Sequence, residues 1–209
     1  MVGATVYLLA LGLPALLALA MLARAVRKAT NSGRLRKAIQ ARGTQPGWRV
    51  HHRKEPRWDG HLAHHRWLTD ETRAVYTVSG PLGGHPATVA LLMRQRPRDV
   101  DVWLTVCLRL PQPVRTVRLE RPWSAVPQGV RWPAGLFYGP RGEGPEPLAD
   151  LLLNTDVPRR LAAVGAPAVS FHDHEVCFLW HPAPRGEHLE SLLDTVLDAL
   201  PVLRAAAAR

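Results

Sequence analysis

Histidines are the residues of this sequence whose types and spacing come closest to a chemical site. Of the ten in the chain, His61, His64 and His65 stand at positions i, i+3 and i+4. On a helix this spacing brings His61 onto one face with His64 or His65, as in some zinc sites. No cysteine lies nearby. We therefore weigh a metal site against a solvated, weakly basic segment packed on a sheet, and favour the second reading.

A second pair, His172 and His174, alternates with Asp173 and Glu175. Two histidines at i and i+2 could chelate a metal or carry protons near neutral pH. Polar residues at such a place are also what the tip of a hairpin selects. We expect a turn here, between strands Ala168–Phe171 and Val176–Trp180.

Other signatures of catalysis are missing from the sequence. It contains no Gly-x-Ser-x-Gly elbow, no phosphate-binding loop, no His-Glu-x-x-His and no Cys-x-x-Cys. The two cysteines, Cys107 and Cys177, lie in apolar runs and could pair or stay free. In a cytosolic compartment they would stay reduced, and we favour simple buried packing. The sequence thus predicts no cofactor and leans away from an enzyme.

The N-terminal segment is the strongest signal in the chain. Val2–Ala23 holds no charged residue, and ten of its 22 residues are Leu or Val. As a helix it would be about 33 Å long, which matches a hydrocarbon core of about 30 Å. Ala18-Leu19-Ala20 resembles a signal-cleavage site, but no basic segment precedes the apolar run, which also exceeds the usual length. We expect an uncleaved transmembrane helix over residues 1–23.

The net charge of +10 belongs to the flank of that segment. Residues 1–54 carry ten Lys or Arg and no acid, which leaves 17 basic and 17 acidic residues in the remainder. A neutral domain argues against a nucleic-acid partner. The positive-inside rule predicts a plasma-membrane protein with its N-terminus outside and its domain in the cytoplasm. In the juxtamembrane stem, residues 24–46, six cations are candidates for binding anionic lipid headgroups: Arg24, Arg27, Lys28, Arg34, Arg36 and Lys37.

The remaining chain, residues 47–209, predicts sheet first and helices later. The stem should be helical but interrupted at Thr30–Gly33. Ala74–Val78 and Ala87–Met93 should form a hairpin with a longer loop. Val100–Leu110 alternates strictly between apolar and other residues, which indicates a strand with one buried face, and Arg115–Glu120 could continue its sheet.

Two helices should follow. Asp156 can cap a helix that ends at Gly165. Leu189 to Leu200 place a single apolar stripe on a helix that Pro201 should kink or end. The sequence therefore predicts an α+β fold: a transmembrane helix, then a two-layer domain with a mainly antiparallel sheet and a C-terminal amphipathic helix.

Short motifs across the chain resemble a group of uncharacterised actinobacterial single-pass membrane proteins with a cytosolic α+β domain. The residues that carry the resemblance are Ala41-Arg42-Gly43 with Gly47-Trp48-Arg49, Val78-Ser79-Gly80 before Gly84-His85-Pro86-Ala87, and Leu108-Arg109-Leu110-Pro111. The chain departs from the group between Glu55 and Leu68, where histidines are dense. The group has no assigned activity, so the resemblance implies an architecture and transfers no functional residue.

We expect a membrane-tethered, non-enzymatic domain that binds a protein partner or assembles with itself. An exposed apolar sheet face around Trp103 would support this expectation. The alternative is a histidine-dependent metal-binding or hydrolytic enzyme at the membrane surface, and a third hypothesis is regulation by lipid at the basic stem.

Overall fold

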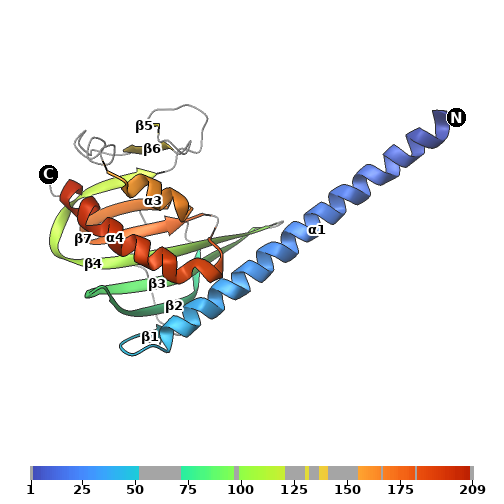
Figure 1. The fold of residues 1–209 in the computed structure, drawn as a ribbon. Coiled ribbons are helices and arrows are strands. Elements are labelled where there is room, and N and C mark those ends of the chain that lie inside the picture. The colour runs from blue at the N-terminus through green and yellow to red at the C-terminus, as the bar shows by residue number, and fades with distance from the viewer. Residues whose placement is uncertain are drawn as a thin grey trace.

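The computed structural model describes residues 2–51, 72–96, 99–120, 130–131, 137–140, 155–165, 167–181 and 183–207. It is an α+β structure, with an antiparallel sheet and helices on one of its faces, as the sequence predicts (Figure 1). In chain order the elements are α1 (Val2–Gly43), β1 (Arg49–His51), β2 (Arg73–Leu82), β3 (His85–Arg96), β4 (Asp99–Glu120), β5 (Val130–Arg131), β6 (Phe137–Pro140), α3 (Val157–Ala163), β7 (Ala168–Trp180), the 3-10 turn η2 (Gly186–His188) and α4 (Leu189–Ala207).

The sheet is built on β4. Strands β1, β2, β3 and β4 follow one another as neighbours, and β7 pairs with the other side of β4. The far end of β4 also pairs with β6, which pairs with β5. Every pairing is antiparallel.

The predicted β2–β3 hairpin is confirmed, but its loop is shorter than expected. Leu82 pairs with His85, so only Gly83 and Gly84 form the turn. Both have positive φ, 56° and 81°, which is the backbone of a type I′ turn and the reason glycine suits both places. A Cβ at Gly83 would also lie 2.5 Å from Leu197 on α4, whereas Gly84 faces open space.

Strand β4 runs without a break through both predicted segments, which confirms that they belong to one sheet. The predicted hairpin over residues 168–180 is wrong, because β7 is one continuous strand. Between Arg109↔Glu175 and Val114↔Asp173 the chain takes five steps along β4 but only two along β7. The excess on β4 is a bulge, and it contains prolines, which cannot donate to the ladder. The polar residues His172 to Glu175, which were predicted to form a turn, therefore lie opposite a bulge in β4.

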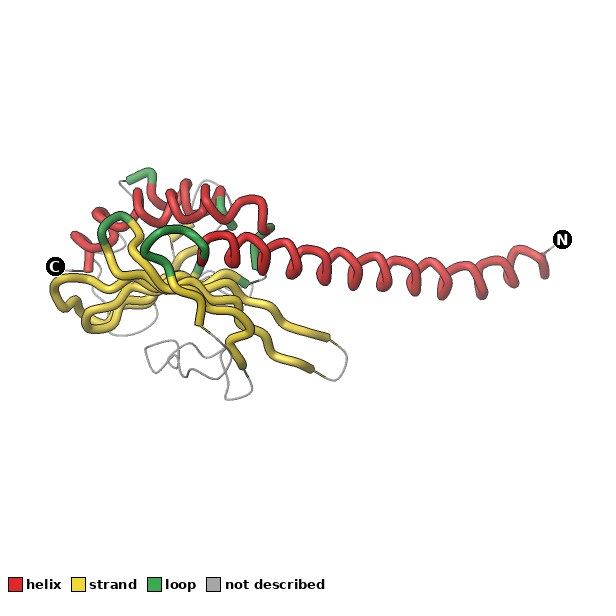
Figure 2. Tube along the Cα trace, turned by 90° about the horizontal axis from the view of Figure 1, so that it is seen from below, coloured by secondary structure: helices red, strands yellow, loops and turns green. Residues whose placement is uncertain are grey.

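Helices α3, α4 and the C-terminal half of α1 cover one face of the sheet (Figure 2). The predicted stripe on α4 is confirmed, since Leu189, Leu192, Leu193 and Val196 are all buried in the core. Pro201 does not end this helix, which continues to Ala207. The predicted helix at Asp156 is also confirmed as α3. Trp180 Nε1 donates to the Val164 carbonyl at 2.8 Å and so satisfies the end of α3.

Helix α1 is one continuous helix, and the predicted interruption at Thr30–Gly33 is wrong. Thr30 Oγ1 donates back to the Val26 carbonyl at 2.8 Å, which accommodates its hydroxyl within the helix. The C-terminal half packs on the domain, while the N-terminal half extends far beyond it (Figure 1). Among the residues that the structure describes, no helix is both long enough and apolar enough to cross a membrane. The side chains of residues 2–15, most of the predicted span, lie outside that description.

Substitution of Gly83 tests the packing between the β2–β3 turn and α4. Asn-Gly is a preferred sequence of a type I′ turn, so Gly83→Asn adds little backbone strain. Its Cβ meets the end of the Leu197 side chain. We expect Gly83→Asn to lower the free energy of unfolding by up to about 1 kcal/mol, and to cost nothing when Leu197 is replaced by alanine, measured by urea unfolding of the full chain. The same loss in both backgrounds would contradict the close approach to α4.

Candidate functional site

The histidine predictions meet different outcomes. His61, His64 and His65 lie outside the described residues, so their metal site stays a prediction. His172 and His174 lie two residues apart on β7. Asp173, between them, has a φ of 51° and lies where the pairing with β4 is irregular. Within the described part of the chain, no three His, Cys, Asp or Glu side chains come together as metal ligands. The described part therefore offers His172 and His174 no third ligand.

His174 has a structural partner instead. Its Nδ1 lies 3.3 Å from the carbonyl oxygen of Leu110, at the start of the bulge. In the tautomer with a proton on Nδ1, the ring donates to that carbonyl. The hydrogen-bond ladder between β4 and β7 is interrupted next to Leu110, where Pro111 follows. His174 therefore gives the Leu110 carbonyl a donor that the strand pairing does not supply there. This contact gives His174 a role in closing the bulge.

The most concentrated group of polar side chains lies on the opposite face of the sheet from α4. Arg94 and Asp101 pair across β3 and β4, with Nη2 and Oδ2 3.1 Å apart. His181, just after β7, places Nε2 3.7 Å from the other oxygen of Asp101. Its ring stacks on Trp103 at 5.1 Å, and the Arg94 guanidinium lies 5.4 Å from the same indole. We call Arg94, Asp101, Trp103 and His181 the tryptophan cluster.

The tryptophan cluster was not predicted from the sequence. A partial signal was present, because Asp101 and Trp103 are two residues apart and so share a face of the strand. Trp103 is only 1% exposed. The exposed apolar face that would have supported a docking surface is therefore not there. The cluster pairs a carboxylate with two basic groups around a buried ring, which is an arrangement suited to holding the strands β3, β4 and β7 together.

Helix α1 is fixed to the domain through a close approach to the segment after β7. Asn31 Nδ2 lies 3.2 Å from the Pro184 carbonyl and 3.5 Å from that of Ala183. Leu35 and Ile39, one and two turns further on, are completely buried in the main core. A Cβ at Gly186 would lie 2.5 Å from the backbone of Arg34 and Leu35. This segment of α1 is thus part of the domain and packs closely against it.

The six cations proposed to bind headgroups divide between two environments. The side chains of Arg24, Arg27 and Lys28 lie outside the described residues. Arg34 is 66% exposed and lies 3.7 Å from Glu187. The guanidinium of Arg36 lies over the ring of Tyr76 on β2, and Lys37 is exposed. Arg36 is therefore exposed but lies beside the sheet.

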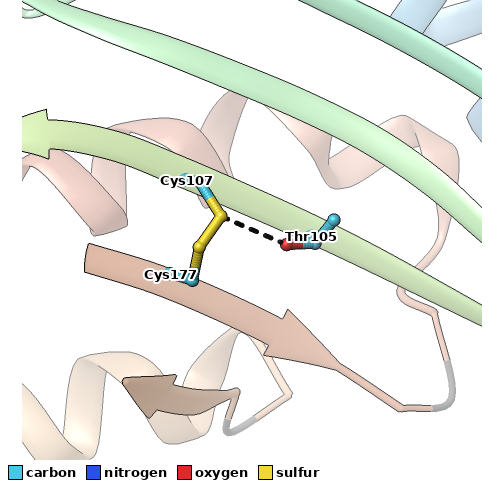
Figure 3. The surroundings of a disulfide bond; sticks show 3 residues. All are labelled: Thr105, Cys107 and Cys177. Atoms are coloured by element: carbon cyan, nitrogen blue, oxygen red, sulfur yellow. Dashed lines mark hydrogen bonds between the residues drawn. A yellow bond between two sulfur atoms is a disulfide. The ribbon is translucent and has the colours of Figure 1, made fainter. Parts of the chain in front are cut away.

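The two cysteines face each other across β4 and β7 as a directly opposed pair. They form a disulfide, with Cα atoms 4.1 Å apart, and Thr105 Oγ1 lies 3.7 Å from the sulfur of Cys107 (Figure 3). The favoured prediction of reduced cysteines that only pack in the interior is wrong, because their strands place them directly opposite each other and the structure contains the paired alternative. Both residues are buried, at 8% and 1% exposure. The link closes a separation of 70 residues, for which chain entropy gives about 4 kcal/mol of stabilisation.

Comparison with known proteins finds no matching family model, no matching curated protein and no matching solved structure. The resemblance to actinobacterial membrane proteins stays a prediction.

Replacing His174 tests its structural role. Asparagine can place an amide N–H where Nδ1 stands, so His174→Asn should retain most of the stability that His174→Ala loses, about 1 kcal/mol. The measurement is urea unfolding, repeated with a chelator and with added zinc. A metal site at His172 and His174 would instead show stability that falls with the chelator and is equally lost in both variants.

Glycine substitutions test the junction of α1 with the domain. We expect Gly186→Ala to lower the free energy of unfolding by about 1–3 kcal/mol, because its Cβ meets backbone that cannot move aside. Gly33→Ala, on α1 itself and facing open space, should instead stabilise by up to about 1 kcal/mol. Thermal unfolding of the full chain separates the two, and a neutral Gly186→Ala would argue against the close contact.

Proposed function

We propose that this chain is a single-pass membrane protein whose N-terminal helix anchors a non-enzymatic interaction or assembly domain. The observation that carries the proposal is the exposed part of α1. Its large apolar side chains are 57–74% exposed: Leu16, Leu17, Leu19, Met21, Leu22 and Val26. At 100° per residue these positions point to every side of the helix.

A helix that is apolar all round needs an apolar environment. Burying six such side chains is worth on the order of 10 kcal/mol. A bilayer supplies that environment, and the uncharged Val2–Ala23 has the length to use it. The anchor and the tethered domain would then form one continuous body, because α1 enters the core at Leu35.

For the orientation, two features of the chain favour opposite sides. The basic flank after the apolar segment favours a cytoplasmic domain. A disulfide is typical of oxidising compartments. We place the domain in the cytoplasm because flanking charge acts during insertion. The buried Cys107 and Cys177 would then be shielded from soluble thiols, which reach them only when the sheet opens.

An interaction role suits the domain better than catalysis. The burial of Trp103 removes one expected docking surface, so this preference rests on the sequence, which carries none of the catalytic motifs named above. A protein partner or a second copy of the chain is the expected ligand. Photo-crosslinking in native membranes, followed by mass spectrometry, would identify it. Crosslinks confined to lipid and to the chain itself as a monomer would contradict the interaction role.

The anchor is tested by charge in the apolar segment. Each arginine near the centre of a span costs about 3 kcal/mol of insertion, so the double variant Leu11→Arg with Leu13→Arg, in the middle of Val2–Ala23, should be released from membranes by alkaline carbonate. The unchanged chain should stay in the pellet. Gln40→Arg, on the exposed side of the docked half of α1, is the matched control and should also stay.

Digestion of right-side-out vesicles tests the orientation separately. We expect the domain to survive external protease until the membrane is opened. Cleavage of the domain from outside would place it on the oxidising side and reverse the proposed topology, while leaving the anchor intact.

A further inference from the structure

The sheet has an overhanging ribbon that points the same way as the free half of α1. Strand β2 first pairs at Arg73↔Met93, and β7 ends opposite Leu104. Beyond these points, among the residues that the structure describes, Arg94–Arg96 and Asp99–Asp101 continue as a two-stranded pair. Figures 1 and 2 both show the ends of β3 and β4 extending along the direction in which α1 leaves the domain.

Hydrogen bonds place the base of this ribbon level with the exit of α1. Ala183 N donates to the Val102 carbonyl at 3.1 Å, and the Ala183 carbonyl accepts from Asn31. From Val102 the ribbon extends three residues, about 10 Å. From Asn31 the helix reaches Ala23, the last residue of the uncharged segment, after eight residues, about 12 Å. The end of the ribbon therefore comes within about 2 Å of the level of Ala23.

Three exposed arginines lie at this end of the domain. Arg34 is 66% and Arg185 72% exposed, and both lie beside the same carboxylate, Glu187, at 3.7 and 3.8 Å. One carboxylate cannot neutralise two guanidiniums, so a positive charge remains. Arg73, at the start of β2, is exposed as well. We call Arg34, Arg73, Arg185 and the ribbon the exit face.

We propose that the exit face rests on the bilayer surface and binds the phosphates of anionic lipids. The inference rests on the anchor proposed above, because the bilayer must surround the apolar part of α1. A headgroup layer is about 5–8 Å deep on each side. An uncharged segment that ends at Ala23 places the end of the ribbon within that layer. The arginines next to the ribbon are then close enough for their long side chains to bind phosphate oxygens in bidentate fashion.

The rigid junction holds the exit face beside the bilayer surface, and the arginines determine how strongly it binds there. Since α1 is continuous through Asn31 and buried from Leu35, the domain cannot swing away on a flexible stem. The anionic lipid content of the membrane would then determine how strongly the exit face binds to the bilayer surface. The hydrophobic anchor and the basic exit face are separate contacts, which allows each to be removed alone.

The test uses the full chain in vesicles with a fluorescent label at one of two exposed positions. Gln95→Cys places the label on the ribbon, and Gln45→Cys places it after the far end of α1. The native cysteines are buried in their disulfide and should not react. Quenching by headgroup-labelled lipid is compared between phosphatidylcholine vesicles and vesicles that also contain phosphatidylglycerol. Flotation of the same samples reports anchoring.

We expect strong quenching at position 95, weak quenching at 45, and an increase at 95 when phosphatidylglycerol is present. Arg73→Glu with Arg185→Glu should lower the seated fraction at 95 by about fivefold per arginine, without changing flotation. Arg109→Glu with Arg159→Glu makes the same charge change at exposed positions elsewhere and should have little effect. Circular dichroism confirms that each variant is folded.

Three results would overturn the proposal. Equal quenching at 95 and 45, or quenching at 95 that ignores the Arg73 and Arg185 reversals, would leave the chain anchored but show that the exit face does not touch lipid. Failure of the unchanged chain to float would overturn the anchor itself, and the seated domain with it.

Discussion

The burial of α1 in the core of the sheet domain is the constraint on which the rest of the structure depends. Leu35 and Ile39 are as inaccessible as any strand residue. Gly186 lets the segment after β7 approach the helix backbone at van der Waals distance. Without this contact, α1 would be joined to the domain by a flexible linker alone, and the direction of the helix would not be fixed relative to the sheet. With it, the helix axis and the sheet form one rigid arrangement.

Several elements could be predicted because a single local pattern determines them. The alternation over Val100–Leu110 indicates a strand with one buried face, and the stripe from Leu189 to Leu200 indicates a helix with one buried face. The two glycines at 83 and 84 report a turn of positive φ. Other features depend on partners distant in sequence. Thr30–Gly33 reads as a helix breaker, yet Asn31 bonds to carbonyls some 150 residues later and the helix continues.

The polar residues of β7 show the same limit. His172 to Glu175 have the composition of a turn, but the opposite strand supplies the irregularity, through the prolines of β4. A bulge is a property of two strands, so no window on one of them reveals it. The tryptophan cluster likewise combines β3, β4 and the residue after β7. The sequence placed Cys107 and Cys177 in apolar strands, but only the register of those strands makes them a pair.

The continuity of α1 from its exposed apolar half into the core is therefore the claim to test first. Spin labels at two exposed positions, introduced as Ala20→Cys and Gln40→Cys, would report it by pulsed electron resonance in lipid bilayers. An unbroken helix places these residues about 30 Å apart, and a single narrow distance distribution at that value is the expected result. A broad or markedly shorter distribution would mean that the helix breaks near Thr30–Gly33, and would contradict the rigid connection between anchor and domain.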